Sequence, residues 1–524
     1  MHTFCNDWAL SNGLCIAFRE TLRGLNPALM DETRSECLVG TRKDIVDLII
    51  HWVGSKAGRI FWLYGVAGSG KSTLSTTIAN LGRSQKYLGA FLFFNRDISE
   101  RNQPKYVIRT LAYQLGLFDA RIGTAIASVI HAIPTITQLS FRDQFHKLLV
   151  EPLSALSSSS GLILLVLDAL DECGSAQDRR DLLAVLTGES VHLPPFIRIV
   201  ITSRNEPEIR KAFTAQPHIL SHELDITSSS NFEDLKLFLR HRMQIIYSLN
   251  DWLEDWPDDA DLLILSERAS GLFEWAATAC RLIEESHDPR ERLDSLLRGS
   301  MNSDAQSALD ALFAHALQIA GIWDDDAFRS DFHAIMGTIL VARDPITVEV
   351  IDNLLSLRRP SVHLISKLGS VLRWSRTDPV RILHPSFADY LTDRLRCGSE
   401  TRYINVGFHH RSLAIHCIDH LDGVLKQNIC NLTLSQPLGN QHLPQTMAYA
   451  AASWIDHVCM IIDGVDSVVV ILESFIIRHL LHWLEAMSVL KKSRSTVEMF
   501  RRLQVYLSVR HVICLESHVA YLSQ

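Results

Sequence analysis

The sequence predicts an α/β domain, built on a parallel β-sheet with helices on both faces, followed by smaller domains that are almost entirely helical. Three observations lead to this fold class. Short β-rich runs alternate with amphipathic helices from about residue 41 to 226, which is typical of a parallel sheet wound with helices. Strand signals fade after residue 226, and a single hairpin signal returns near residue 375. At 524 residues the chain is too long for one ordinary core.

The composition is that of a folded protein, with 47% hydrophobic and 21% charged residues. A net charge of −8 gives no overall positive field that would attract nucleic acid or an anionic membrane. The ten cysteines are scattered and form no C-x-x-C pair, which favours reduced thiols and a cytoplasmic protein. The first residues do not resemble a signal peptide, and no apolar stretch reaches the roughly 20 residues of a membrane span.

The α/β domain is expected to occupy residues 41–226, after a lead-in segment at residues 1–40. Its strands are predicted from short apolar runs rich in branched and aromatic residues, each bounded by turn residues. These runs are Ile60 to Tyr64, Ala90 to Phe94, Leu162 to Leu167, Ile197 to Thr202 and His218 to Leu224.

The remaining chain is expected to form three further domains. Apolar residues at helical spacing after Asn231 predict a small helical domain over residues 227–300. Within residues 301–395, a hairpin is predicted from Val371 to Trp374 and Val380 to Leu383, around the turn at Asp378 and Pro379. Helices with one hairpin indicate a winged-helix domain. Residues 396–524 are expected to be helical, without a repeated period of 20 to 50 residues.

The segment from Gly65 to Ser72 fits the pattern G-x-x-x-x-G-K-[ST] between a predicted strand and a predicted helix. In such a P-loop the glycines let backbone N–H groups and the helix N-terminus face a phosphate, and the lysine reaches the outer phosphates. We expect ATP or ADP here, with GTP less favoured, and Ser72 as a magnesium ligand. The residues expected to contact the nucleotide are Gly65, Val66, Ala67, Gly68, Ser69, Gly70, Lys71, Ser72 and Thr73.

A magnesium ligand opposite Ser72 is expected at the end of a neighbouring buried strand. The apolar run from Leu162 ends at Asp168, which fits this position. Asp171 and Glu172 follow three and four residues later, and either one can be the general base that polarises the attacking water. Arg204 ends the next strand, where it is either a sensor of the terminal phosphate or a solvated arginine.

These residues resemble the NACHT branch of the STAND signalling ATPases, in particular the fungal proteins with a nephrocystin-3-like N-terminal or NWD-type module. Members place a small residue after the magnesium aspartate and paired acids beyond it, as Ala169, Asp171 and Glu172 do here. The stretch from Cys37 to Arg42 also resembles the family. Gly271-Leu272-Phe273 resembles its Gly-Leu-Pro element, although Phe273 replaces the proline that packs on adenine.

The resemblance also extends to the winged helix and the helices that follow it. In the motif from Ile382 to Leu391, His384 matches a histidine that reaches the ADP phosphate in the closed state. The family implies a closed ADP state and an open ATP state that forms homo-oligomers. Members usually add an N-terminal effector and C-terminal repeats, which are not visible here, so protein partners are expected to supply the sensor or effector.

Three functions remain open from the sequence. The first is a signalling switch with slow ATP hydrolysis, acting in non-self recognition or programmed cell death. The second is a motor ATPase that acts on protein or nucleic acid, although the acidic net charge makes nucleic acid an unfavourable partner. The third is a scaffold that binds nucleotide without turnover. A dense group of histidines near His416 and His420 has metal-like spacing, but we expect a structural or surface role for it.

Overall fold

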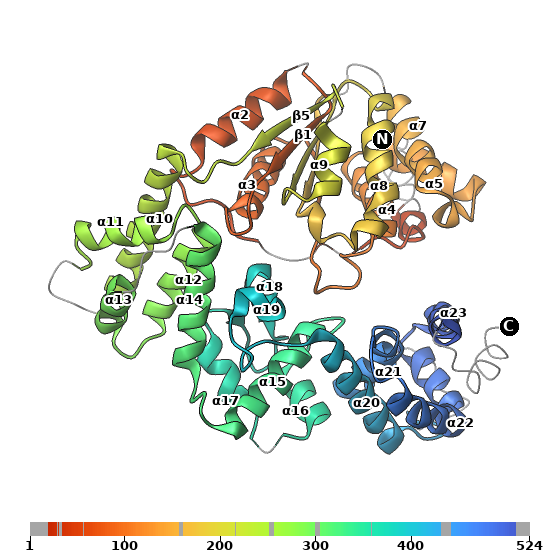
Figure 1. The fold of residues 1–524 in the computed structure, drawn as a ribbon. Helices are drawn as coiled ribbons and strands as arrows, with labels where there is room; N and C mark the ends of the chain where they lie inside the picture. Colours follow the sequence, from red (N-terminus) through yellow and green to blue (C-terminus); the bar gives the residue numbers. More distant parts are fainter. Residues whose placement is uncertain are drawn as a thin grey trace, which may run out of the picture. The chain divides into compact units, whose positions relative to one another are not determined.

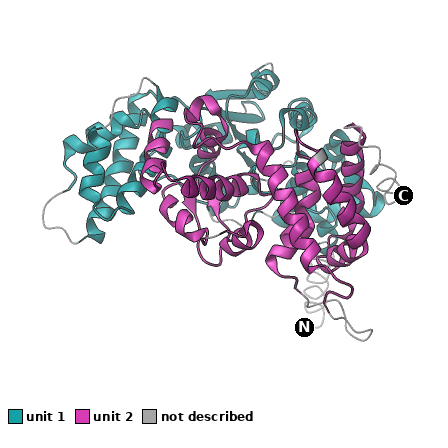
Figure 2. Cartoon of the chain, turned by 60° about the horizontal axis from the view of Figure 1, so that its bottom comes forward, with its two compact units in different colours: residues 1–309 teal, residues 310–524 magenta. Residues whose placement is uncertain are grey.

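The computed structural model describes residues 19–509 except residues 29, 31–33, 56, 157–160, 215, 251–255, 299–303, 358 and 431–441, and the side chain of residue 466 is also not described. The chain divides into two compact units, Met1–Leu309 and Asp310–Gln524 (Figure 2). The start of the chain, which the sequence indicates is not a signal peptide, lies outside the described residues, as does most of the lead-in segment.

The first unit contains a five-stranded parallel sheet in the order β2-β3-β4-β1-β5. Each of the five predicted strands is present within two residues of its predicted ends, which confirms the predicted fold class. Parallel pairing aligns Ile60 with Ile199 and with Ile219, so β1 lies between β4 and β5. The strands are β1 Ile60–Tyr64, β2 Leu88–Phe93, β3 Ile163–Asp168, β4 Ile197–Ser203 and β5 Ile219–Glu223.

Helices cover both faces of this sheet because alternate residues of each strand point to opposite faces. In β1, Trp62 belongs to the core on the side of α4 and α8, whereas Phe61 belongs to the core on the side of α2 and α3. Figure 1 shows these helices on the two sides of the strands. The helices are α2 Lys43–Gly54, α3 Lys71–Ser84, α4 Val107–Phe118, α5 Ala120–Ala132, α6 Phe141–Phe145, α7 Glu151–Ser154, α8 Ala176–Gly188 and α9 Pro207–Thr214.

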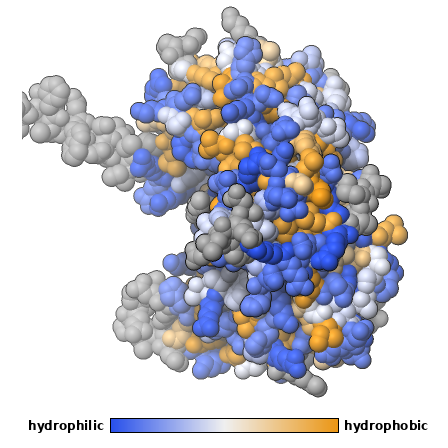
Figure 3. Space-filling model, turned by 90° about the vertical axis from the view of Figure 1, so that its left-hand side faces the viewer, coloured by the Kyte–Doolittle hydropathy of each residue, from blue (hydrophilic) through white to orange (hydrophobic). Residues whose placement is uncertain are grey.

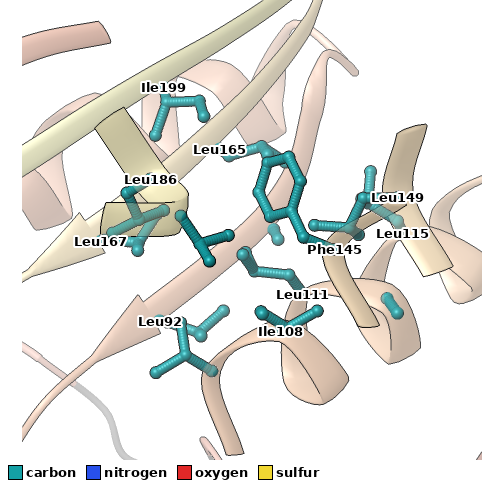
Figure 4. Packing of buried hydrophobic residues seen from close by; sticks show 14 of the residues in the cluster. Leu92, Ile108, Leu111, Leu115, Phe145, Leu149, Leu165, Leu167, Leu186 and Ile199 are labelled. Atoms are coloured by element: carbon teal, nitrogen blue, oxygen red, sulfur yellow. The ribbon is translucent and has the colours of Figure 1, made fainter. Parts of the chain in front are cut away.

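The larger core packs β2, β3 and β4 against α4 and the helical segment after α6. Figure 4 shows Leu165 and Ile199 of the sheet near Phe145, with Leu111 of α4 below them. All four side chains are at most 2% exposed. This apolar layer fixes the strand ends from which the functional side chains project, because strands buried on both faces cannot slip in register without exposing their core residues.

A helical region completes the first unit. Its helices are α10 Ser229–Leu249, α11 Asp259–Arg268, α12 Phe273–Glu284 and α13 Pro289–Arg298, and α14 Ala305–Ala320 runs on into the second unit. Leu235, Leu239 and Met243 of α10 are buried at helical spacing, as the sequence predicts.

Among its described residues, the second unit is helical apart from one antiparallel hairpin, β6 Leu372–Arg373 and β7 Arg381–Ile382. The hairpin lies where the sequence predicts it, with shorter strands. The first helices that lie wholly in the second unit are α15 Asp326–Val341, α16 Val348–Leu355, α17 Val362–Ile365, α18 Pro385–Thr392 and α19 Arg394–Cys397. The later helices are α20 Val406–Val424, α21 Gln445–Val458, α22 Asp466–Val489 and α23 Ser493–Val509.

One helix, Ser467–Val489, is long and apolar enough to cross a membrane by length and composition, with a mean hydropathy of 1.5. From the sequence no apolar stretch of this length is expected, and this helix corrects that expectation. One of its faces packs inside the unit, because Trp483 is fully buried and donates a hydrogen bond of 2.8 Å to the Ala451 carbonyl. Core helices of soluble proteins meet the same criterion of length and composition.

The face of the molecule drawn in Figure 3 carries its hydrophobic residues in separate groups among hydrophilic ones.

Candidate nucleotide-binding site

The candidate site lies at the edge of the sheet where the parallel strands end. β1 leads into the P-loop after Tyr64, and β3 ends at Asp168. β4, which lies between these two strands, ends at Ser203. Because parallel strands have their carboxyl ends at one edge, the sequence segments carrying the predicted residues meet here.

The P-loop has the backbone conformation that its glycines predict. Gly68 and Gly70 have φ angles of 79° and 90°, in the left-handed region that side chains rarely adopt. A Cβ atom on Gly68 would also lie 2.9 Å from the Cβ atom of Glu274. Gly70 is the N-cap of α3, and Lys71 is the first residue of that helix. The loop therefore delivers a helix N-terminus to the sheet edge, which is an arrangement suited to an anion.

The Lys71 side chain folds back over this loop. Its ammonium group donates hydrogen bonds of 2.9 Å to the Gly65 carbonyl and 2.7 Å to the Val66 carbonyl. Burial lowers the pKa of Lys71 to about 8, although nearby carboxylates, Asp171 foremost, oppose this shift. Four predicted residues lie close enough to Lys71 for their charges to act on its pKa: Asp171, Arg204, Asp168 and Glu172. The structure therefore brings the P-loop lysine together with the residues that follow β3 and β4.

Asp168 is fully buried at the end of β3. The Thr202 hydroxyl donates a hydrogen bond of 2.5 Å to one carboxylate oxygen, and the Arg34 guanidinium lies 2.6 Å from the other. Burial alone would raise the pKa of Asp168, but the charge of Arg34 and the Thr202 hydrogen bond outweigh it and lower the pKa. Asp168 is therefore a buried anion, stabilised by the Arg34 cation and by the hydroxyl groups of Thr202 and Ser75.

The two acids beyond Asp168 have different surroundings. Asp171 accepts a hydrogen bond of 2.9 Å from the backbone N–H of Arg204, and the Nε atom of Arg204 lies 3.3 Å from its other oxygen. Glu172 accepts a longer hydrogen bond, 3.4 Å, from the backbone N–H of Arg96. Burial raises the pKa of Glu172 to about 7, whereas Arg96 acts to lower it. Asp171 is thus paired with Arg204, and Glu172 can exchange a proton near neutral pH.

Ala169 explains why a small residue follows the buried aspartate. Its φ of 59° and ψ of 46° place it in the left-handed region, and its backbone N–H donates a hydrogen bond of 3.0 Å to the Thr202 hydroxyl. Its side chain is only 9% exposed. A branched side chain would meet both a strained backbone and a lack of space here.

Two arginines at the site were not predicted as site residues. Arg34 contacts Asp168, and its guanidinium also lies 4.6 Å from the centre of the Phe93 ring, in a cation–π contact. Arg42 donates a hydrogen bond of 2.7 Å to the Ser69 carbonyl of the P-loop. Arg34 is 134 residues from Asp168 in the chain and belongs to no motif, so the sequence contains no signal for this pair.

The Gly-Leu-Phe element does reach the P-loop. The Phe273 ring lies 3.9 Å from the position of a Cβ atom on Gly70, and the Arg42 guanidinium lies 4.7 Å from the ring centre. The backbone N–H of Glu274 donates a hydrogen bond of 3.1 Å to the Gly68 carbonyl. Phe273 therefore packs against the P-loop, although the proline of the family pattern is absent.

His384 lies in the second unit, where it caps α18. Its Nδ1 atom accepts a hydrogen bond of 3.2 Å from the backbone N–H of Ser386. This contact gives His384 a structural role within its own unit. Its expected role as a nucleotide latch stays a prediction.

The residues at the sheet edge fit a nucleotide and magnesium. The loop carries two glycines with positive φ, which let the backbone curl around an anion, and Lys71 supplies a cation beside it. The Ser72 hydroxyl and the Asp168 carboxylate are oxygen donors, which magnesium prefers. The donor set contains neither sulfur nor imidazole.

One known protein family resembles part of this chain. Residues 41–204 match the family model described as "Nephrocystin 3, N-terminal", so the chain contains a domain of this type. No curated protein sequence matches the chain significantly.

Among solved structures, a STAND protein with a tetratricopeptide repeat sensor from Pyrococcus horikoshii matches with a TM-score of 0.44 and 14% identity, over 94% of this chain and 60% of that one. This chain thus spans less than two thirds of that protein. The Aeropyrum pernix ORC1 protein in complex with DNA matches with a TM-score of 0.34 and 16% identity, over 75% and 96% of the two chains.

Proposed function

We propose that this chain binds ATP and magnesium at the edge of its parallel sheet and acts as a STAND-type signalling switch that hydrolyses ATP slowly. The observation that carries the proposal is the convergence of Lys71, Asp168 and the Asp171–Arg204 pair at one sheet edge. The P-loop backbone, Lys71 and Thr73 would hold the phosphates, and Ser72 and Asp168 would hold magnesium. The metal would supply positive charge that offsets the charge of the phosphates.

For hydrolysis we assign the proton acceptor to Glu172 and a positioning role to Asp171. Asp171 already binds Arg204 through both carboxylate oxygens, so it is suited to orient that guanidinium toward a phosphate. Glu172 has a pKa of about 7 and is therefore close to half deprotonated at neutral pH.

The signalling role rests on the resemblance to NACHT proteins together with the nephrocystin-3-type domain. Such a switch would be closed with ADP and would form homo-oligomers with ATP, with His384 as the latch in the closed state. It would act in the cytoplasm with protein partners that supply a sensor or an effector, in non-self recognition or programmed cell death.

Light scattering of the purified full chain tests the switch. We expect a larger particle mass with magnesium and a non-hydrolysable ATP analogue than with magnesium and ADP. The Lys71→Ala variant should have the same mass in both solutions, because it lacks the phosphate contact. Equal masses for the unaltered chain, combined with fast steady-state hydrolysis, would overturn the switch and favour a motor.

A scaffold that binds nucleotide without turnover is the second candidate. Arg34 favours it, because its guanidinium holds the Asp168 oxygen that a magnesium ion would need. Measuring phosphate release over hours separates the candidates. A slow rate that disappears in Glu172→Gln supports the switch, whereas ATP binding with no measurable release supports the scaffold.

A further inference from the structure

A second cluster of charged and imidazole groups lies away from the nucleotide site. It consists of His146, Glu189 and His192. His146 begins a π-helical turn, His146–Val150, and the other two residues lie in the turn between α8 and β4. They precede the amino end of β4, whereas the nucleotide site lies at its carboxyl end. Within the described residues this is the one group of three such side chains with metal-ligand geometry.

The ligand atoms of the cluster are close to the spacing that a tetrahedral metal ion requires. The His146 Nε2 atom lies 2.6 Å from Glu189 Oε2, and His192 Nε2 lies 3.7 Å from the same oxygen. All three ligand atoms are within 4.8 Å of one another. With bonds of about 2.0–2.1 Å, tetrahedral zinc separates its ligand atoms by roughly 3.4 Å. To reach this spacing the His146 contact must lengthen and the His192 contact must shorten slightly, and the two imidazole side chains are 34% and 55% exposed.

The surroundings of Glu189 resemble the support that metal ligands receive in proteins. Arg142 Nε lies 2.9 Å from Oε1, which leaves Oε2 facing the imidazoles. The Glu189 backbone N–H binds the Val185 carbonyl at 2.9 Å, and the His192 N–H binds the Glu189 carbonyl at 3.0 Å. The hydrogen bond from His146 lowers the pKa of Glu189, and Arg142 adds to this shift, so the carboxylate is charged at neutral pH. Outer partners that fix a ligand in this way strengthen metal binding.

We propose that His146, Glu189 and His192 bind one zinc-class divalent cation, with water as the fourth ligand. Two imidazoles and one carboxylate favour zinc over magnesium or calcium, which prefer oxygen donors alone. The ion would join the π-helical turn to the connection that leads into β4. Since the cluster is remote from the P-loop, the ion would stabilise the first unit without taking part in nucleotide chemistry.

Calorimetric titration of zinc chloride into the chelator-treated full chain tests this proposal, in a buffer free of nucleotide. We expect one zinc ion per chain and a higher unfolding temperature with zinc. His192→Ala and Glu189→Gln should abolish this binding event. Arg142→Ala should weaken it by about tenfold, the low end of the effect of outer partners. Cobalt at the same site should give the intense visible absorption of a tetrahedral complex.

His482→Ala is the matched control, because His479 and His482 form another histidine pair, with Nδ1 atoms 3.3 Å apart, in the second unit. It should leave the titration unchanged. The proposal is overturned if the unaltered chain binds no zinc, or if His192→Ala binds zinc as tightly as the unaltered chain. Circular dichroism checks that each variant is folded, and His192→Ala should fold as the unaltered chain does because His192 is exposed. A separate ATP titration of His192→Ala should match the unaltered chain, so this test is independent of the proposed nucleotide site.

Discussion

The contact between Arg34 and Asp168 yields a prediction about the metal-free protein. The Arg34→Gln variant removes the cation beside a carboxylate that is fully buried. Breaking a buried ion pair by removing one partner costs about 3–5 kcal/mol. Arg34 is 22% exposed, and the Thr202 hydrogen bond stays in place, so we expect a smaller loss, about 2–3 kcal/mol.

Thermal unfolding of the full chain in the presence of a metal chelator measures this loss. A change of about 2–3 kcal/mol lowers the unfolding temperature of a large domain by at least about 4 °C. Arg121→Gln is the matched control, because it breaks an ion pair of the same length, 2.6 Å, on a side chain that is 62% exposed. An exposed ion pair contributes little to stability, so this control should barely move the transition.

Magnesium and ATP should reduce the difference between Arg34→Gln and the unaltered chain, because under the proposed function the metal replaces Arg34 as the cation beside Asp168. The Asp168→Asn background completes a double-mutant cycle, in which Arg34→Gln should have little further effect. If Arg34→Gln unfolds at the same temperature as the unaltered chain without metal, Arg34 does not stabilise the buried carboxylate. If Arg34→Gln is equally destabilising in the Asp168→Asn background, its effect does not act through Asp168.

Three further predictions concern neighbouring residues. Glu172→Gln should slow hydrolysis by about 10²-fold or more while ATP affinity is retained. Asp171→Asn should leave the dependence of the hydrolysis rate on pH unchanged. Because the pKa of Glu172 is raised to about 7, the hydrolysis rate of the unaltered chain should rise as pH passes through 7. The same shift means that Glu172 favours the folded state at low pH and loses this contribution between about pH 4.5 and 7. The urea midpoint of Glu172→Gln, measured relative to that of the unaltered chain at the same pH, should therefore be higher at pH 8 than at pH 4. Ala169→Val should lower the free energy of unfolding in urea by about 1–3 kcal/mol, whereas Ala169→Gly, which accepts a φ of 59°, should not. Equal stability of the two variants would show that the backbone of residue 169 is not strained. Arg42→Ala, which removes the hydrogen bond to Ser69, should weaken ATP binding by about tenfold in calorimetry, and unchanged affinity would show that the loop holds its shape without it.

Local patterns made the sheet and the P-loop predictable. A strand buried on both faces is a continuous apolar run, so Ile163 to Leu167 could be recognised together with the Asp168 that ends it. The glycine spacing around Lys71 reflects backbone angles that only glycine adopts easily. The hairpin was predicted from its turn, but its strands are shorter than predicted, since each has only two residues that form pairs with the other strand.

Contacts between distant segments could not be predicted from local patterns. Arg34 and Asp168 are far apart in the chain, and neither residue alone indicates the other. His146 and Glu189 are 43 residues apart, and they meet only because β4 and the π-helical turn pack on the same core. The histidines of α20 are dense in the sequence, and among them His410 is buried with its Nδ1 atom 3.1 Å from that of His457.

Binding of ATP is measured by calorimetric titration of the full chain, with and without magnesium. We expect one ATP per chain and tighter binding with magnesium. Lys71→Ala should lose binding, because it removes the ammonium group that lies over the P-loop. His51→Ala, an exposed change at the end of α2, should bind as the unaltered chain does. Micromolar ATP affinity retained by Lys71→Ala would show that the P-loop is not the nucleotide-binding site.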